Sequence, residues 1–146
     1  MREILFRGKC GYNNEWVDGF YYKAKLYRSD KELCHYITIP HPESDGRPSD
    51  HIMVHPETVG QFTGLTDKNG KKIFEGDIVH ILGHHDVEDW KNVDYTALID
   101  FLDGGFCAID GTVEEHGFRR YALARLDFSL EVIGNIHDNP ELLQNQ

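Results

Sequence analysis

Residues 93–101 read VDYTALIDF and give the clearest secondary-structure signal in this chain. All five odd-numbered positions are apolar, whereas three of the four even-numbered positions are polar. Because successive side chains of a β-strand point to opposite faces, this alternation predicts a strand with one buried face. Asp103-Gly104-Gly105 then predicts a turn, and residues 106–109 predict the returning strand. The stretch therefore predicts a β-hairpin.

Short runs of similar character occur along the rest of the chain, bounded by Gly, Asn, Asp or Pro. We expect further strands over residues 2–7, 15–27, 34–39, 52–55, 78–82 and 130–136. Gly19 is expected to mark a bend or bulge within the second of these strands. Asn69-Gly70 predicts a hairpin turn, since both residues tolerate positive φ. Asp138 and Pro140 predict the start of a short C-terminal helix.

With so little helix, the strands must protect one another's edges, which favours a small barrel or two packed sheets. Residues 76–79, GDIV, form a strand opening that is common in SH3-like barrels. We predict a mainly β fold, with an SH3-type barrel in the C-terminal part, additional N-terminal β-strands and a short C-terminal helix. One domain, 1–146, is expected. Its segment 41–50, with two prolines and a glycine, predicts a loop between sub-units 1–40 and 51–146.

The composition is that of a folded, acidic protein. The 146 residues are 40% hydrophobic and 12% aromatic, which supplies a core and excludes wholesale disorder. A net charge of −10 argues against a broad basic surface for nucleic acid. Residues 1–31 hold seven Lys/Arg against four Asp/Glu, and the remainder holds eight against twenty-one. This asymmetry fits either solvated acidic loops or a surface that binds a basic partner or a second copy.

Cellular location is predicted from what the chain lacks. Its first residues, MREILFRGKCGY, have no apolar stretch of the kind found in a secretory signal. No apolar run approaches the ~18 residues of a membrane span. Cys10, Cys34 and Cys107 are scattered without a CxxC pair, which suits a reducing compartment. We expect a cytoplasmic protein without membrane association.

Nine histidines make metal binding the first chemistry to consider. His80, His84 and His85 lie beside Asp86, Glu88 and Asp89, and imidazoles with carboxylates can bind zinc. The segment 83–92 predicts a solvated acidic loop, however, and no helix brings these imidazoles together. A looser group, His41, His51 and His55, has the same weakness. We expect no metal and no cofactor, and keep the first three histidines as the weak alternative.

No arrangement of residues predicts catalysis. Cys10 and Cys34 are close to histidines only in sequence, and no nucleophile-elbow motif occurs. Ser49-Asp50-His51 has the residue types of a triad, but folding rather than adjacency normally assembles one. The carboxylate pair Glu114-Glu115 has no apolar setting that would raise its pKa. A Walker A motif is absent. We therefore expect a non-enzymatic protein with no catalytic residues.

A small basic cluster gives the one candidate interaction surface in the sequence. Lys68, Lys71 and Lys72 surround the predicted Asn-Gly turn, next to Phe74. Hairpin tips of this kind contact nucleic-acid backbones in SH3-like and OB barrels. Ordinary solvation of three lysines is the simpler interpretation, and a net charge of −10 predicts weak affinity for nucleic acid.

Three stretches of the chain share the features of a known family. They read, in order, FRGK (6–9) and WVDG (16–19); TVGQFTGL (58–65), DKNGK (67–71) and IFEGDIV (73–79); and EVIGNI (131–136) and NPELL (139–143). In this order, and over nearly the whole chain, they resemble the YopX family of phage and prophage proteins. The middle stretch is the most specific of the three.

The resemblance implies a mainly β architecture with an SH3-type barrel, and expression from phage or prophage genes in a bacterial cytoplasm. It implies no activity and no site residues. The middle stretch also has a structural explanation, since glycines meet turn and bulge demands and apolar residues fill a barrel interior. The glycines are Gly60, Gly64, Gly70 and Gly76, and the interior residues are Leu65, Ile73, Phe74, Ile78 and Val79.

The function predicted is that of a phage-derived, non-enzymatic module that binds another protein. The alternative is a nucleic-acid-related or anti-host role, through DNA mimicry by the acidic surface or weak binding by the lysine tip. A metal-dependent enzyme is the least favoured hypothesis of function. Exposed strand edges and uneven charge leave self-association open.

Overall fold

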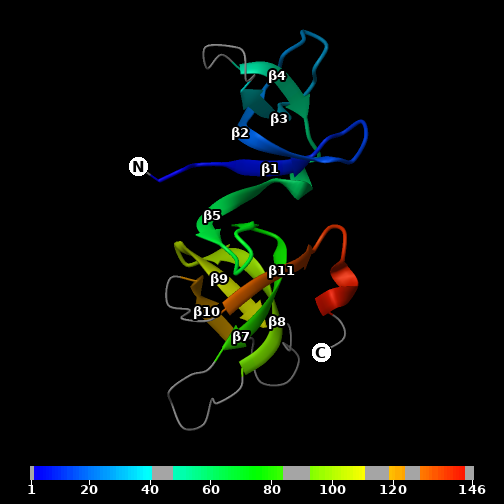
Figure 1. The fold of residues 1–146 in the computed structure, drawn as a ribbon. Helices are drawn as coiled ribbons and strands as arrows, with labels where there is room; N and C mark the ends of the chain where they lie inside the picture. The colour runs from blue at the N-terminus through cyan, green and yellow to red at the C-terminus, as the bar shows by residue number, and fades with distance from the viewer. Residues whose placement is uncertain (1, 41–47, 84–92, 111–118, 124–128, 144–146) are drawn as a thin grey trace. The chain divides into compact units, whose positions relative to one another are not determined.

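The computed structural model describes residues 2–40, 48–83, 93–110, 119–123 and 129–143 (Figure 1). These residues form eleven strands and two short 3₁₀ helices, and no α-helix is found within them. The strands are β1 (Phe6–Lys9), β2 (Trp16–Ala24), β3 (Cys34–Pro40), β4 (Pro48–Met53), β5 (Gly60–Thr66), β6 (Lys72–Phe74), β7 (Asp77–Gly83), β8 (Val93–Leu102), β9 (Gly105–Asp110), β10 (Arg119–Ala122) and β11 (Ser129–Asn135). The helices are η1 (Pro56–Thr58) and η3 (Pro140–Leu143).

The mainly β prediction is therefore confirmed, and η3 is the short helix expected near the C-terminus. The pairings of β2 with β1 and β3, of β1 with β5, of β3 with β4, of β7 with β8 and β11, and of β9 with β8 and β10 are all antiparallel. One sheet has the order β4-β3-β2-β1-β5-β6, and the other has the order β10-β9-β8-β7-β11. Neither helix in the described ranges has the length and hydropathy needed to cross a membrane.

The chain divides into two compact units, Met1–Phe62 (unit 1) and Thr63–Gln146 (unit 2). Strand β5 begins in the first unit and ends in the second. The boundary lies after the position expected from the proline-rich segment 41–50. The reason is strand pairing, because β4 begins at Pro48 inside that segment and pairs with β3 in unit 1.

Unit 1 is built on β2, β3 and β4, with β1 beside β2. Tyr22 lies opposite Tyr36 on β3, and Tyr36 lies opposite Met53 on β4. Beyond β4, Val54 forms a bridge to Cys10, and Gly11 N donates to Met53 O at 2.8 Å. These contacts bring the end of β4 back to the end of β1.

Gly19 on β2 is required by a close approach of two strands. A Cβ at this position would lie 2.3 Å from Thr38 O and 2.9 Å from an Ile37 methyl group. Its φ is not in the left-handed region. The sequence predicted a special role for this glycine as a bend or bulge, and the structure assigns the role to packing against β3 instead.

The core of unit 2 lies on one face of the sheet formed by β7, β8 and β9. Ala97 is fully buried and Ile99 nearly so, as the alternation along 93–101 predicts, while Phe101 at the end of the strand is 48% exposed. The buried side chains of this core are Ile73, Val79, Ile81, Ala97, Ile99, Ala108, Leu123 and Leu130. The predicted interior residues Ile73, Phe74, Ile78 and Val79 are all buried.

Leu65 was wrongly predicted as an interior residue. It is 41% exposed, whereas Phe62 on the same strand is buried. Gly64, between the two residues, has a φ of 88°, which interrupts the regular alternation of the strand. The last three residues of β5, Gly64 to Thr66, are all exposed, so the end of the strand that carries Leu65 lies at the surface.

The expected SH3-type barrel is not closed by the strand pairings of the described residues. The five-stranded sheet has β10 and β11 as its outer strands. Two hydrogen bonds nevertheless link the turn after β5 to β11: Lys68 N donates to Leu130 O at 2.8 Å, and Val132 N donates to Asp67 Oδ2 at 3.0 Å.

Strand β10 was not predicted, because its four residues show no alternation and only pairing with β9 defines it.

Candidate functional site

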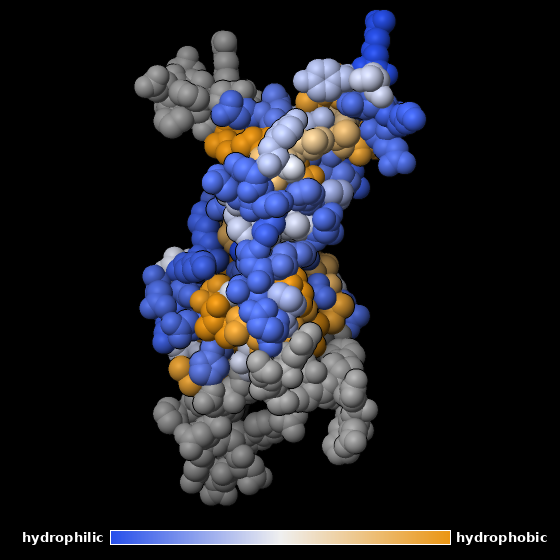
Figure 2. Space-filling view, turned by 90° about the vertical axis from the view of Figure 1, so that its right-hand side faces the viewer, coloured by the Kyte–Doolittle hydropathy of each residue, from blue (hydrophilic) through white to orange (hydrophobic). Residues whose placement is uncertain are grey.

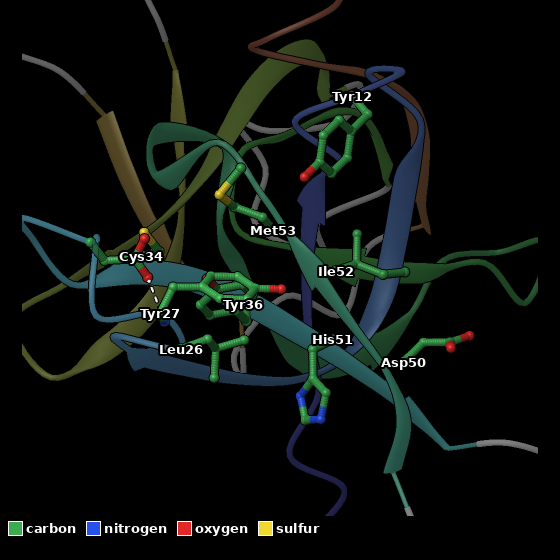
Figure 3. Close-up of a pocket in the computed structure, with 10 residues that line it drawn as sticks. Tyr12, Leu26, Tyr27, Cys34, Tyr36, Asp50, His51, Ile52 and Met53 are labelled. Carbon is green, nitrogen blue, oxygen red and sulfur yellow. Dashed lines mark hydrogen bonds between the residues drawn. The ribbon is translucent and has the colours of Figure 1, made fainter.

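A hollow of about 640 Å³ in unit 1 is the candidate site (Figure 3). Its described lining combines three tyrosines with aliphatic side chains, two carboxylates, one histidine and one cysteine. They are Tyr12, Leu26, Tyr27, Asp30, Cys34, Tyr36, Asp50, His51, Ile52 and Met53. A volume of this size is within the range of about 300–1,000 Å³ that is usual for ligand pockets.

Two strands and two loops bring these side chains together. Cys34 and Tyr36 come from β3, and residues 50–53 come from β4. Because Tyr36 pairs with Met53 and Thr38 pairs with His51, alternate residues of both strands share one face of the sheet. Residues 10–15 between β1 and β2, and 25–33 between β2 and β3, supply the remaining walls.

Each of the two loops is held by local hydrogen bonds. In the first, Glu15 N donates to Asn13 Oδ1 at 3.0 Å, and Asn14 adopts a positive φ of 58°. In the second, Tyr27 N donates to Asp30 Oδ2, and Asp30 N donates back to Tyr27 O, each at 3.1 Å. Side-chain acceptors of this kind satisfy loop amides that no strand pairs. The loops therefore present Tyr12 and Tyr27 from defined turns.

The three tyrosines differ sharply in exposure. Tyr12 is 85% exposed and Tyr27 is 68% exposed, whereas Tyr36 is only 5% exposed. Tyr36 stacks on Tyr22 with ring centroids 5.5 Å apart. Burial raises the pKa of Tyr36 to about 12, aided by a hydrogen bond to Cys34 and by the charges of Cys34 and Asp30. The Tyr36 hydroxyl is therefore protonated at neutral pH.

His51 is tied to the sheet rather than aimed freely into the hollow. Its Nδ1 hydrogen-bonds the Tyr22 hydroxyl and lies 3.4 Å from Thr38 Oγ1. The Tyr22 ring also meets the imidazole edge-on, with centroids 5.7 Å apart. These contacts fix the orientation of the ring at one end of the hollow.

The described lining carries negative charge without a cationic partner from Lys or Arg. Asp30 lies at the Tyr27 end, where its carboxylate accepts the Tyr27 amide. Asp50 lies at the other end in Figure 3, where its carboxylate points away from the hollow, on the opposite face of β4 from His51. A lysine of the neighbouring loop, Lys25, is directed elsewhere, since its Nζ donates to Lys31 O at 2.9 Å.

The candidate catalytic pairs named from the sequence do not come together where the structure describes them. Asp50 and His51 are consecutive on β4, so their side chains leave opposite faces and cannot form part of a triad. Cys34 and His35 are separated in the same way, and His35 Nδ1 hydrogen-bonds the Tyr21 hydroxyl at 2.5 Å. Cys10 is buried.

The weak metal candidates remain apart or undescribed. His80 lies on β7 opposite Thr96 and Glu131, while His84 and His85 lie outside the described residues. Likewise His51 and His55 are described and His41 is not, and His55 Nε2 contacts Asn14 Oδ1 at 3.0 Å. Within the ranges that the structure describes, no three His, Cys, Asp or Glu side chains are grouped to hold a metal ion.

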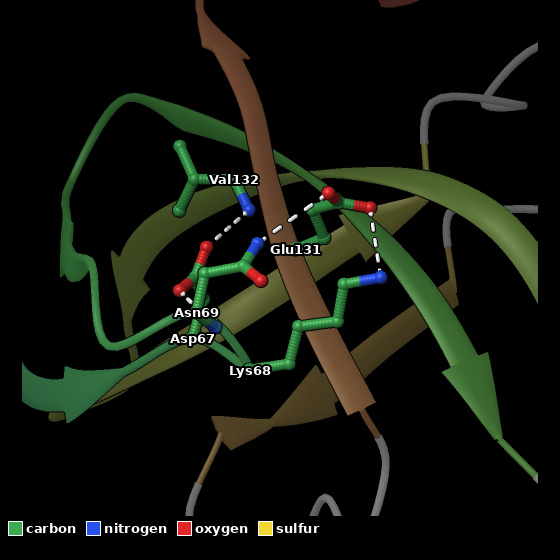
Figure 4. Close-up of polar contacts among 5 residues, drawn as sticks. All are labelled: Asp67, Lys68, Asn69, Glu131 and Val132. Carbon is green, nitrogen blue, oxygen red and sulfur yellow. Dashed lines mark hydrogen bonds and ion pairs between the residues drawn. The ribbon is translucent and has the colours of Figure 1, made fainter.

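The lysine tip is part of a polar network in unit 2 (Figure 4). Lys68 Nζ lies 3.2 Å from Glu131 Oε2, so an acidic residue offsets one of the three positive charges. Phe74 is only 4% exposed and belongs to the interior, so it adds nothing to an accessible surface. Lys71 lies beside the turn, and Lys72 is the first residue of β6.

The sequence did not single out the hollow. Its aromatic residues stand at positions 12, 27 and 36, and no motif links them. The available signal was Tyr12, in a segment that the strand pattern left as a loop. Leu26 and Tyr27 belonged to the strand expected over 15–27, whereas β2 ends at Ala24 and leaves both residues in the loop that follows. Large apolar side chains in such loops indicate either a packing role or a binding surface.

Comparison with protein families establishes the family to which this chain belongs. The family model described as YopX protein matches residues 5–144. This chain belongs to the YopX family. The resemblance noted in the three sequence stretches is thereby confirmed, and the family match covers both units of the fold.

Among solved structures, this YopX-family chain is similar to protein EF1440 from Enterococcus faecalis, known from a crystal structure. The two sequences are 25% identical, and the TM-score is 0.48. The alignment covers 98% of this chain and 99% of the other. A search among curated proteins finds no match.

Proposed function

We propose that this chain is a prophage-derived, non-enzymatic module that binds a protein in the bacterial cytoplasm, through the face of unit 1 that carries the hollow. The observation behind the proposal is the concentration of exposed aromatic and aliphatic side chains on unit 1. Six of the ten large hydrophobic residues that are exposed in the described ranges lie there: Ile4, Tyr12, Phe20, Leu26, Tyr27 and Leu33.

Exposed apolar groups support an interaction role when they cluster around a concave site. Tyr12, Leu26 and Tyr27 are each at least 45% exposed, and all three line the hollow. Tyrosine is enriched where proteins bind one another, because its ring buries a large area and its hydroxyl still finds a partner. On the face drawn in Figure 2, hydrophobic surface lies in patches bordered by hydrophilic side chains.

The non-enzymatic part of the proposal is supported by the separation of the candidate catalytic residues. Each candidate pair consists of consecutive residues of one strand, Cys34 and His35 on β3 and Asp50 and His51 on β4, so its two side chains leave opposite faces. Hydrogen bonds to tyrosine hydroxyls hold both imidazoles. A nucleophile and its base need side chains within hydrogen-bond reach of each other. The described pairs do not meet that requirement.

A finer description of unit 2 is also proposed: an open relative of the SH3-type barrel. The hydrogen bond from Lys68 N to Leu130 O and that from Val132 N to Asp67 support it, since they link the β5–β6 turn to the outer strand β11. These contacts lie where a further strand pairing would close a barrel.

Affinity capture from lysate of the bacterial host tests the proposed function. The full chain is the bait, with and without nuclease, and mass spectrometry identifies what is retained. The decisive variant is Tyr12→Ser/Tyr27→Ser, which removes two exposed rings and is expected to leave the fold intact. Ile4→Ser is the matched control, because Ile4 is 54% exposed and does not line the hollow.

A saturable, nuclease-resistant protein that the double variant loses and Ile4→Ser keeps would support the proposal. Capture that the double variant retains would overturn the assignment to this face. Recovery that disappears with nuclease would move the function to nucleic acid.

A further inference from the structure

We infer that the hollow of unit 1 receives the positively charged end of a lysine or arginine side chain from the partner protein. This inference rests on the proposed function, and it names the chemistry by which the partner is recognised. Three features of the described lining carry it: charge, aromatic surface and size.

The charge of the lining is one-sided. Asp30 supplies a carboxylate, Asp50 lies at the rim on the opposite face of β4 from His51, and no Lys or Arg is among the described lining residues. Asp30 Oδ2 accepts the Tyr27 amide at 3.1 Å, and a carboxylate has further lone pairs to offer beyond this hydrogen bond. A guanidinium or ammonium group is the natural complement of such a carboxylate.

The aromatic walls favour the same ligand. A cation is attracted to the face of a tyrosine ring, and more strongly where water is partly excluded. Tyr27 and Tyr36 accompany Asp30 in the lining, and Tyr12 lies across from them in Figure 3. Unit 1 already contains this interaction, since Arg7 Cζ lies 4.6 Å from the centroid of the Trp16 ring.

The cations nearby in the sequence are not part of the lining. Lys25, Arg28 and Lys31 belong to the same β2–β3 loop as Tyr27, but the described lining contains none of them. Lys25 Nζ is held by the Lys31 carbonyl. The Asp30 carboxylate therefore faces no lysine or arginine of the described lining and can pair with a charge from another molecule.

Other occupants fit less well. An acidic or phosphorylated group would face the Asp30 carboxylate, with a repulsion that no Lys or Arg of the described lining offsets. A purely apolar side chain would remove water from Asp30 without replacing its hydrogen bonds, which costs free energy. The hollow, at about 640 Å³, also has room for the backbone on either side of one basic residue.

Binding of three capped tripeptides to the full-length, ¹⁵N-labelled chain tests the inference. The probes are acetyl-Ala-Arg-Ala-amide, the same peptide with citrulline, and the same peptide with glutamate. Citrulline has nearly the shape of arginine but no charge. We expect the arginine peptide to shift the amide signals of Tyr27, Asp30 and Tyr36 saturably, and to bind at least about fivefold more tightly than the citrulline peptide.

Two carboxylate variants locate the charge. In Asp30→Asn an acceptor oxygen remains for the Tyr27 amide, so the loop is preserved while the charge is removed. This variant is expected to weaken the arginine peptide about fivefold, Asp50→Asn to weaken it less, and Glu57→Gln to leave it unchanged. Glu57 is an exposed acid of unit 1 outside the described lining.

Equal binding of the arginine and citrulline peptides would overturn the inference and leave an uncharged docking site. Preference for the glutamate peptide would also overturn it. So would the absence of any shift up to ~50 mM peptide, since ligands of this size are expected to bind with millimolar constants. If capture from lysate still depends on Tyr12 and Tyr27 in any of these cases, only the cation inference fails. Capture that is indifferent to both tyrosines would overturn the proposed function itself.

Discussion

At the scale of single residues, Asp67 joins two parts of unit 2 that are far apart in sequence. Its Oδ1 accepts hydrogen bonds from the amides of Asn69 and Lys71, at 2.8 and 2.9 Å. Its Oδ2 accepts the amide of Val132 on β11 at 3.0 Å. The side chain is only 7% exposed, so these three donors have little access to water as a substitute.

We predict that Asp67→Asn lowers the free energy of unfolding by about 1–3 kcal/mol, because an amide places a donor where three backbone donors converge. Urea denaturation of the full chain measures the loss. Asp103→Asn is the control, since Asp103 is an exposed turn residue with φ of 50°, a conformation that asparagine tolerates. Equal stability of the two variants would contradict the prediction.

The same residue predicts a dependence of stability on pH. Burial favours a higher pKa, but the hydrogen bonds from Val132, Lys71 and Asn69 and the charge of Lys71 outweigh it, so the pKa of Asp67 is lowered. A carboxyl with a lowered pKa in the folded state stabilises fully above its unfolded value of about 3.9, and this contribution is lost as pH falls through the folded value.

We therefore expect the difference in unfolding free energy between the native chain and Asp67→Asn to be constant from about pH 6 to 8 and to shrink below about pH 4. Urea titrations at a series of pH values check this. A difference that grew on acidification would have the wrong sign for a lowered pKa.

At the scale of elements, the pairing of β2 with β3 depends on the absence of a side chain at Gly19. A Cβ there would lie 2.3 Å from the Thr38 carbonyl oxygen, and backbone cannot move aside as a flexible side chain can. The strand must then shift away from its neighbour, which also disturbs the Tyr22–Tyr36 stack beside the hollow.

Gly19→Ala is predicted to destabilise the chain by more than about 2 kcal/mol, as overpacking of a tight site does. Thermal unfolding followed by circular dichroism measures the effect. Gly105→Ala on β9 is the matched control, because a Cβ there meets nothing within 4 Å and its φ is not positive. That control is expected to stay within about 0.5 kcal/mol of the native chain.

Elements with a strong local signal could be predicted. Strands β8 and β9 follow from alternation and from the turn at 103–105, where Asp103 and Gly104 both have positive φ. Strand β3 begins at Cys34, as expected. Strand β4 was placed only in part, since the strand expected over 52–55 covers its last two residues. Its first residues belong to a proline-rich segment, and only pairing with β3 makes them extended. Strand pairing is a non-local property, which local propensity does not encode.

At the scale of the whole molecule, charge constrains the partner. Phosphates repel a chain with a net charge of −10, and Glu131 pairs with one of the three lysines at the turn. We predict no measurable binding of a DNA oligonucleotide at ~150 mM salt, and no change in Lys68→Ala/Lys71→Ala/Lys72→Ala. Fluorescence anisotropy over a range of salt concentrations tests this. Binding that falls steeply with salt and disappears in the triple variant would favour the nucleic-acid alternative.

The sequence by itself determined the mainly β class, most strand positions, the turn glycines and membership of the YopX family, because alternation, turn chemistry and family motifs are local patterns. Only the tertiary structure decided the hollow. Tyr12, Tyr27 and Tyr36 come from two loops and a strand, and they meet because β3 pairs in one register with β2 and β4. The same folding exposed Leu65, which the sequence placed in the interior, since the burial of a side chain depends on what packs against its strand.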